Sequence, residues 1–368
     1  FGSSQLAARC KSARRTRQCL GHLRIPGLMA ACTVHGDTVG GRRVVACHAL
    51  TTGDEVLREA PALAAPGRID LGSPVCPHCL RRQGLTPSSA LRAREEVAGG
   101  VEAVPCTRCR DAELAFCSAR CAEDRGPLHA MECALVEPLL GLLFEVPLPL
   151  QRALLLLRCS LAATLRKDGG EPTAGYAFLG CLEDHIEDGP ALDDSAAAEL
   201  AQLLSSAVAA ASPEDVQRWL SRIDTYAFCC GCGGTAGGAL FRLASFFNHS
   251  CCPNALTRWD ATAGEMVVTA AEPIAAGEEI TISYLGHRCE LDSCACGLRW
   301  ASERAGPPGC PGPGPGPGTL ALPLHWPSMG RAERRQRLLA TKHFACCCPR
   351  CERESGDEPE SAASLTSW

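Results

Sequence analysis

Residues 246–254 read Phe-Phe-Asn-His-Ser-Cys-Cys-Pro-Asn, and residues 277–284 read Gly-Glu-Glu-Ile-Thr-Ile-Ser-Tyr. The first run brings an amide, an imidazole and thiols together within a few positions. The second run is typical of a short strand that follows a turn and ends at a tyrosine. An Asn-His pair alone has little meaning, but inside the full nine-residue run it is specific. Asn248, His249 and Tyr284 are therefore the first candidates for a functional site.

Cysteine is the outlier of the composition, with 26 residues in a chain of 368. Such a content indicates disulfides or metal, and several cysteines fall in C-x-C and C-x2-C pairs, whose spacing suits one tetrahedral Zn²⁺. The chain is long, and no clean apolar signal region stands near its start, which favours zinc in a reducing compartment over a secreted scaffold. The longest apolar run, residues 139–157, contains charged residues and prolines and does not predict a membrane span.

The net charge is −5 and the isoelectric point about 6.1. Neither value favours nucleic acid or a membrane surface as a partner. DNA binding is further disfavoured because no basic recognition helix follows the zinc-spaced cysteines.

The first metal constellation consists of four ligand pairs. They are Cys76-x2-Cys79, Cys106-x2-Cys109, Cys117-x3-Cys121 and His129-x3-Cys133. Eight ligands predict two Zn²⁺ ions, because each ion takes four. A disulfide framework or eight unrelated thiols is the less favoured alternative. The role of the zinc stays open: it holds a small lobe folded even if it does nothing else.

These motifs resemble those of two known protein families. Phe116-Cys117-Ser118-x2-Cys121-x7-His129-x3-Cys133 resembles the MYND zinc finger, and the two runs around Asn248 and Tyr284 resemble the carboxy-terminal half of a SET domain. Their order resembles that of the SET and MYND domain (SMYD) lysine methyltransferases. The resemblance implies a mixed α/β fold, in which a SET β-fold is split by a MYND finger and a helical insert and followed by a cysteine-rich post-SET segment. It also implies methyl transfer from S-adenosylmethionine to a protein lysine.

The resemblance assigns roles to individual residues. Tyr284 is the implied catalytic residue, at the mouth of a lysine channel. The implied S-adenosylmethionine-binding residues are Gly41, Ser245, Phe247, Asn248, His249, Tyr284 and Phe344. In the finger, Cys76, Cys79, Cys117 and Cys121 would hold one zinc ion, and Cys106, Cys109, His129 and Cys133 the other. A third zinc is implied at Cys251, Cys346, Cys348 and Cys351, with Cys252 and Cys347 as the alternatives if the ligand set shifts by one position.

Residues 33–64 alternate short β-like runs with glycine turns and predict a small antiparallel unit. Ser212-Pro213-Glu214-Asp215 predicts a helix start, and residues 331–339 predict a short basic helix.

The domain organisation follows from composition and from the resemblance. The expected segments are a basic leader at 1–32, the first SET part at 33–75, the MYND-type finger at 76–133, a helical insert at 134–225, the SET catalytic core at 226–285, a Pro/Gly-rich insertion at 286–330, the post-SET zinc segment at 331–353 and a disordered tail at 354–368. The leader is either a transit peptide or sequence upstream of a start at Met29, and composition favours the second.

Three positions depart from the family pattern. Lys342 stands where a second tyrosine is usual, Arg43 where a glycine lets the backbone approach the cofactor, and Tyr226 where an asparagine is usual. These departures favour a rival hypothesis, a catalytically weak scaffold that recruits partners through its MYND finger.

The expected partners are a protein substrate lysine, histone or non-histone, and a proline-containing peptide at the finger, with no membrane. Both cytoplasm and nucleus stay open as locations. The identity of the substrate and the degree of methylation do not follow from the sequence.

Overall fold

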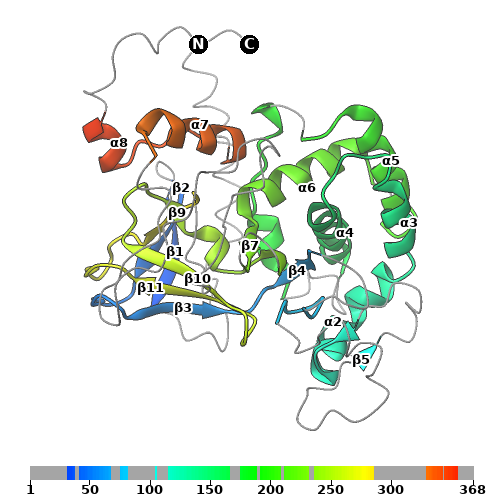
Figure 1. Cartoon of the computed structure of the whole chain (residues 1–368), viewed down its shortest axis with the longest axis horizontal. Helices are drawn as coiled ribbons and strands as arrows, with labels where there is room; N and C mark the ends of the chain where they lie inside the picture. Colours follow the sequence, from blue (N-terminus) through cyan, green and yellow to red (C-terminus); the bar gives the residue numbers. More distant parts are fainter. Residues whose placement is uncertain are drawn as a thin grey trace, which may run out of the picture.

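The computed structural model describes residues 31–37, 41–67, 75–81, 104–105, 115–165, 175–188, 191–208, 211–231, 236–285, 329–342 and 344–354. A lobe rich in strands lies beside a helical lobe, so the predicted mixed α/β class is confirmed (Figure 1). Residues 1–30 of the predicted leader, residues 286–328 of the predicted insertion, and the tail from residue 355 fall outside the described residues, as do Cys106 and Cys109.

The strands are β1 (Cys32–Asp37), β2 (Gly41–Ala46), β3 (Glu55–Glu59), β4 (Leu63–Pro66), β5 (Val104–Pro105), β6 (Ala115–Phe116), β7 (Phe228–Cys230), β8 (Gly237–Leu240), β9 (Asn248–His249), β10 (Ala255–Asp260), β11 (Glu265–Ala270) and β12 (Thr281–Ile282). The α-helices are α2 (Ala119–Glu132), α3 (Val136–Leu142), α4 (Leu150–Thr164), α5 (Asp194–Leu204), α6 (Pro213–Tyr226), α7 (Arg331–Lys342) and α8 (Pro349–Arg353). Short 3₁₀ turns lie at Ala177–Cys181, Ile186–Asp188 and Ala244–Phe246.

The strands form several small sheets rather than one. β1 and β2 make the antiparallel hairpin that the sequence predicts. The next two strands do not stay with this hairpin: β3 pairs with β11 and β4 pairs with β8, and the paired residues are 171 to 214 positions apart in the chain. The predicted local unit at 33–64 is therefore only partly correct. All four residues of β4 are buried, and a strand buried in this way needs partners that only the later half of the chain supplies.

Helix α4 is the centre of the helical lobe. Ten consecutive residues, Ala153–Ala162, are buried, and the helix packs against α2, α3 and α6 and against strands β4 and β8. A helix that is apolar around most of its circumference needs such enclosure. α6 begins as the sequence predicts, with Ser212 and Asp215 forming a reciprocal capping box.

Helix α2 lies in the segment where the cysteine spacing predicted only a metal-held lobe. Ser118 caps the amino-terminal end of the helix, and its hydroxyl accepts a hydrogen bond from the backbone N–H of Cys121. The side chains that α2 buries against the rest of the molecule are mostly polar: Arg125, Leu128, His129 and Glu132. Apolar periodicity cannot reveal a helix whose buried face is charged.

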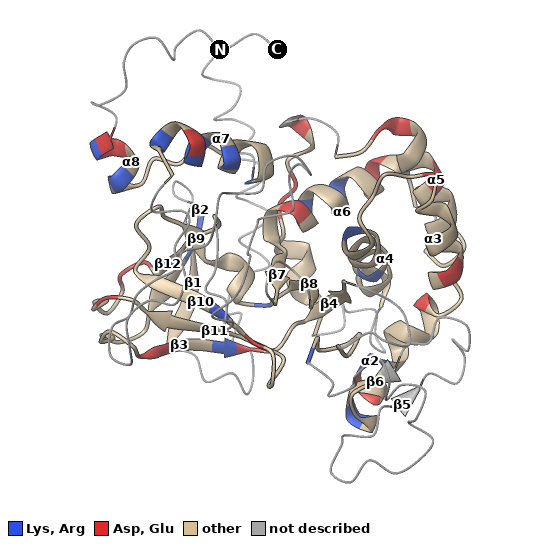
Figure 2. Cartoon of the chain, in the orientation of Figure 1, with Lys and Arg blue, Asp and Glu red and all other residues tan. Residues whose placement is uncertain are grey.

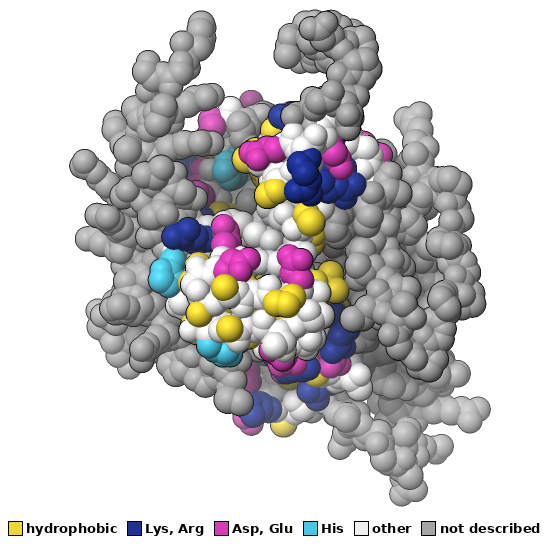
Figure 3. All heavy atoms as spheres, turned by 90° about the vertical axis from the view of Figure 1, so that its left-hand side faces the viewer, with side chains coloured by type: hydrophobic (Ala, Val, Ile, Leu, Met, Phe, Trp, Pro, Cys, Tyr) yellow, Lys and Arg dark blue, Asp and Glu magenta, His cyan; other side chains and the backbone are white. Residues whose placement is uncertain are grey.

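Helices α7 and α8 lie above the strand-rich lobe in Figure 1, and α7 packs against α6. Both helices carry basic and acidic side chains together (Figure 2). The face shown in Figure 3 likewise has acidic and basic side chains interspersed, not one continuous field of either sign. Among the described helices, none combines the length and the apolar character needed to cross a bilayer.

Candidate active site and metal centres

The two sequence runs of interest meet through a short parallel pairing. β9 lies beside β12, with Asn248 opposite Thr281 and His249 opposite Ile282. The pairing continues as the N–H of Ser250 donates to the carbonyl of Ile282 at 2.9 Å. This register places the Asn-His pair directly beside the chain that leads to Tyr284.

Asn248 is fixed by hydrogen bonds from its side-chain amide. Nδ2 donates to the backbone carbonyl of Arg42 at 2.7 Å and to Oε1 of Glu279 at 2.8 Å. The two acceptors come from β2 and from the turn before β12, so the amide connects the first hairpin of the lobe to the segment that leads into β12. With Nδ2 held in this way, the orientation of the amide is set by the protein itself.

His249 connects the candidate catalytic tyrosine to a cysteine cluster. Its Nδ1 accepts from the backbone N–H of Tyr284 at 3.0 Å, and its Nε2 lies 3.2 Å from Sγ of Cys251. Because a backbone N–H can only donate, Nδ1 must be the acceptor. The neutral ring therefore carries its proton on Nε2 and donates it toward the sulfur.

Tyr284 lies in an aromatic cluster. Its hydroxyl donates to the carbonyl of Phe247 at 2.5 Å, and its ring centroid lies 5.3 Å from that of His249 and 6.2 Å from that of Phe344. Burial, with Tyr226 nearby, raises the pKa of the Tyr284 hydroxyl above its ordinary value. The hydroxyl therefore remains a neutral hydrogen-bond donor at physiological pH.

The other predicted cofactor residues fall in two groups. Phe344 belongs to the aromatic cluster around Tyr284, whereas Phe247 contributes its backbone carbonyl, which accepts from the Tyr284 hydroxyl. The hydroxyl of Ser245 accepts from the N–H of Phe241 and donates to the carbonyl of Tyr226, each at 3.0 Å, so it holds the backbone together. Gly41 lies at the end of the β1–β2 hairpin, where it pairs with Asp37.

Arg42 is the basic residue that enters the site, whereas the predicted obstacle, Arg43, has an exposed side chain. The guanidinium of Arg42 donates to the carbonyl of Cys181 and to the hydroxyl of Tyr226, and it lies 3.7 Å from the carboxylate of Glu183. It also lies 5.0 Å from the ring centroid of Phe246. One of the departures, Tyr226, thus meets Arg42: the backbone carbonyl of Arg42 holds Asn248, and its side chain holds Tyr226.

Lys342, the third departure, reaches the same site from the last turn of α7. Its Nζ donates to the carbonyls of Asp224 at 2.7 Å and Thr225 at 2.9 Å, at the end of α6. The same nitrogen lies 5.6 Å from the ring centroid of Tyr284. Burial lowers the pKa of Lys342 to about 8. The nearby Cys229 and Asp224 act in the opposite direction and raise this pKa.

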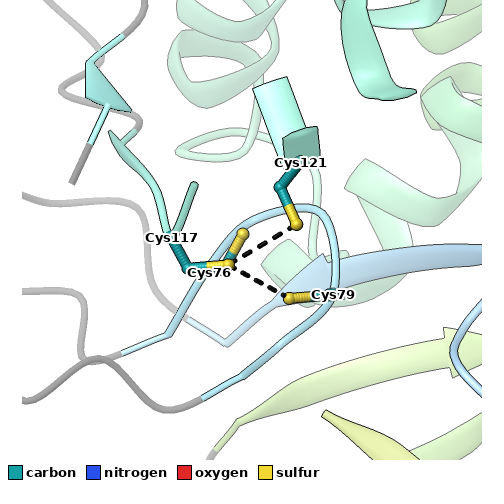
Figure 4. Close-up of side chains that lie close together, drawn as sticks. All are labelled: Cys76, Cys79, Cys117 and Cys121. Atoms are coloured by element: carbon teal, nitrogen blue, oxygen red, sulfur yellow. Dashed lines mark hydrogen bonds between the residues drawn. The ribbon is translucent and has the colours of Figure 1, made fainter. Parts of the chain in front are cut away.

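The structure brings Cys76, Cys79, Cys117 and Cys121 together, with their sulfur atoms pointing toward one another (Figure 4). The Sγ atom of Cys117 lies 3.6 Å from that of Cys79 and 3.5 Å from that of Cys121. Four sulfurs around a tetrahedral Zn²⁺, each at about 2.3 Å, would be about 3.8 Å apart, whereas a disulfide needs about 2.05 Å. The spacing fits zinc and excludes a disulfide in this arrangement.

The predicted post-SET cysteines form a second tetrad, with Sγ of Cys251 3.8 Å from that of Cys346 and 3.6 Å from that of Cys351. Cys348 completes this group, while the alternatives Cys252 and Cys347 are both exposed. Sulfur spacing again fits zinc. The fully buried Arg334 lies beside the tetrad, with Nη2 3.6 Å from Sγ of Cys351, which suits a cluster of thiolates.

The remaining predicted ligand set cannot be assembled from the described residues, because Cys106 and Cys109 fall outside them. His129 and Cys133 stand at the end of α2. Nδ1 of His129 lies 3.1 Å from Oε1 of the buried Glu132, an arrangement that orients the ring and leaves Nε2 as the nitrogen suited to a metal. That this set holds zinc stays a prediction.

Sequence reasoning missed the charged network around Glu132. This carboxylate accepts from Nη2 of Arg125 at 2.6 Å and from Nε and Nη2 of Arg158 at 2.9 and 3.1 Å. Arg158 also donates to the carbonyls of Ala64 and Pro77. Since Pro77 lies between two of the clustered cysteines, the network ties the first tetrad to α2 and α4. An arginine inside the apolar run of α4 was the one available signal.

Comparison with known proteins places this geometry in a family. Residues 67–285, more than half of the chain, match the SET domain family. A curated relative, the histone-lysine N-methyltransferase ATXR2 of Arabidopsis thaliana, is 44% identical over 64 residues, which cover 17% of this chain and 12% of that protein. The chain thus spans about an eighth of the length of this relative.

Two solved structures are similar at 10% identity and a TM-score of 0.35. One is the SET domain of LSMT bound to lysine and AdoHcy, with 76% of this chain and 54% of that chain covered. The other is Rubisco LSMT bound to AdoMet, with 74% and 52% covered. The family match over residues 67–285 includes Asn248, His249 and Tyr284, and on this match the chain belongs to the SET domain family.

Proposed function

We propose that the chain is an S-adenosylmethionine-dependent protein-lysine N-methyltransferase. The observation that carries the proposal is the joining of Asn248, His249 and Tyr284 by the β9–β12 pairing within a chain of the SET domain family. The relative ATXR2, named a histone-lysine N-methyltransferase, supports the same reaction class over the part of the chain that it matches.

The chemistry of the site suits a methyl donor that carries a positive charge. The rings of Tyr284, Phe344 and His249 lie with their centroids 5.3 to 6.2 Å apart, and the carbonyl of Phe247 lies beside them; aromatic rings and carbonyl dipoles attract a sulfonium. Asn248, already oriented by Arg42 and Glu279, would hold the bound molecule by its polar end. When bound, S-adenosylmethionine supplies the methyl group.

The protein's part in the reaction is to position a neutral amine. An amine attacks only through its lone pair, so the lysine must lose its proton first, and a buried aromatic site favours the neutral form. Tyr284, kept protonated by burial, would line the end of the lysine channel and orient the amine by its hydroxyl.

We propose zinc in both cysteine tetrads and a further zinc at Cys106, Cys109, His129 and Cys133, which together would make residues 76–133 a MYND-type finger. The tetrad around Cys251 would tie α8 to the strand that carries His249, because His249 donates toward Cys251. This zinc would therefore stabilise the catalytic site itself. The finger would bind a proline-containing peptide, and the substrate would be a histone or another protein in the nucleus or cytoplasm.

The charges of Arg42 and Lys342 favour the alternative, a scaffold without catalysis. A cation near a sulfonium weakens its binding, since like charges at short distance in a buried site repel strongly. Under this alternative the site would bind S-adenosylmethionine poorly, and partner recruitment through the finger would be the remaining function.

Calorimetry of S-adenosylmethionine binding to zinc-loaded protein tests the two functions. We expect micromolar binding by the native chain, loss of binding in Asn248→Ala, and unchanged binding in Arg43→Gln, a control at an exposed position next to the site. Folded, zinc-replete native protein that binds no S-adenosylmethionine would exclude the enzyme and leave the scaffold.

A further inference from the structure

Lys342 places a primary amine at the ring of the candidate catalytic tyrosine. Nζ lies 5.6 Å from the ring centroid of Tyr284, and its hydrogen bonds to Asp224 and Thr225 hold it there. Tyr284 in turn contacts Phe344, which follows Lys342 by two residues. The amine is thus built into the wall of the site by residues from α6, α7 and the end of β12.

The choice of lysine at this position is informative because the chain hardly uses lysine. Among its 36 lysine and arginine residues there are three lysines, Lys11, Lys167 and Lys342. Every other basic residue of α7 is an arginine. A cation that merely capped the carbonyls at the end of α6 could be an arginine, since its guanidinium also donates to carbonyls. Only a lysine can lose its proton and act as a nucleophile, because arginine remains charged at any physiological pH.

We infer that Lys342 is a methyl acceptor in the chain's own catalytic site. This inference rests on the proposed function. The lone pair of neutral Nζ forms the new N–C bond while the C–S bond of the sulfonium breaks, with its electron pair left on sulfur. The resulting methylammonium then releases a proton to water, and S-adenosylhomocysteine leaves.

The surroundings of Lys342 supply the neutral amine that this step requires. Burial lowers the pKa of Lys342 to about 8, and the acidic groups that face it, Asp224 on α6 and Cys229 beside it on β7, prevent a larger shift. Among the described residues, the ring of Tyr284 also faces the amine. With a pKa of about 8, about a quarter of the amine is neutral at pH 7.5.

Methylation has a structural consequence at the α6–α7 contact. The amine uses two hydrogens to donate to the carbonyls of Asp224 and Thr225. A protonated monomethyl amine keeps both donors, a dimethyl amine keeps one, and a trimethyl amine keeps none. The structure therefore favours a single methyl group, because further methylation breaks bonds that hold α7 against α6.

Mass mapping of the full-length, zinc-loaded chain after incubation with deuterated-methyl S-adenosylmethionine tests the inference. The three lysines can be read separately, so Lys11 and Lys167 serve as internal controls. We expect one labelled methyl at Lys342, at a rate independent of protein concentration, and its loss in Tyr284→Phe but not in Lys167→Arg. Calorimetry with S-adenosylmethionine runs in parallel on the native chain and on Lys342→Met, which removes the amine without leaving a charge at this position.

The outcomes separate this inference from the proposed function. Native protein that binds S-adenosylmethionine but leaves Lys342 unlabelled after a day at pH 9 overturns the inference and leaves the enzyme in place. Labelling whose rate rises with protein concentration also overturns it, since transfer would then pass between molecules. Absence of binding by folded protein removes both. Tight binding by Lys342→Met, with label in the native chain alone, supports the inference.

Discussion

Replacement of Glu132 by glutamine should destabilise the protein more than any other single charge removal on α2. The carboxylate is fully buried and accepts from Arg125 at 2.6 Å, from Arg158 at 2.9 Å and from His129 at 3.1 Å. Both arginines are also buried. Glutamine keeps the shape of the side chain but leaves two guanidinium groups without a compensating charge.

The magnitude follows from the burial of this network. Removal of one partner from a buried ion pair costs about 3–5 kcal/mol, because the remaining charge stays desolvated. In a domain of this size each kcal/mol lowers the unfolding midpoint by about 2–4 °C, so we expect Glu132→Gln to unfold about 10 °C below the native chain. Loss of the carboxylate that orients His129 should also weaken zinc binding at that end of α2.

The assay is thermal unfolding of zinc-loaded protein, followed by tryptophan fluorescence at one scan rate. Glu214→Gln is the matched control. Glu214 pairs with Arg218 at 2.5 Å, but both side chains are exposed, and an exposed pair contributes less than about 1 kcal/mol. Equal unfolding midpoints for Glu132→Gln and Glu214→Gln would refute the reasoning. They would show that the buried carboxylate contributes no more to stability than the exposed one.

Three further predictions concern the metal centre, a glycine at the start of β8 and an ionisable group. Cys346→Ser should lower the zinc content by one ion per chain, measured by atomic emission, whereas Cys347→Ser, at the exposed neighbouring position, should not. Gly237→Ala should destabilise the fold by about 1–3 kcal/mol in urea titrations, because φ is +145° and a Cβ would lie 2.0 Å from the carbonyl oxygen of Ala65; a midpoint equal to the native one would contradict this. The urea stability of the native chain relative to Lys342→Met should rise between pH 8 and about 10.5, since burial lowers the pKa of Lys342 and the unfolded chain binds more protons in that window; a constant difference would show that the amine is solvated.

Local pattern predicted several features of the fold correctly. The β1–β2 hairpin follows from a pair of β-like runs around a glycine turn, and α6 follows from Ser212-Pro213-Glu214-Asp215. α7 follows from its charged helical run. In each case the residues that decide the element lie within about one turn of each other, so the sequence already contains the relevant contacts.

The pairing of distant strands and the location of α2 could not be predicted in this way. β3 and β4 are neighbours in the chain, yet they pair with β11 and β8, and periodicity does not reveal which of several apolar strands will meet. α2 was missed because its buried face is made of Arg125, His129 and Glu132. Charged and polar residues of this kind are expected on the solvent-exposed face of a helix unless a buried partner, such as Arg158, is known.

The sequence by itself determined which residues are the candidates for chemistry: the cysteine pairs, the Asn-His run and the tyrosine after β12. Family resemblance then grouped the cysteines, and the structure brings both complete tetrads together. Only the tertiary structure decided what surrounds them, including Arg42 against Tyr226 and Lys342 over Tyr284. Ligand spacing is a property of a few adjacent residues, whereas these pairs join positions 58 to 184 residues apart, and their contacts exist only once the lobes have packed.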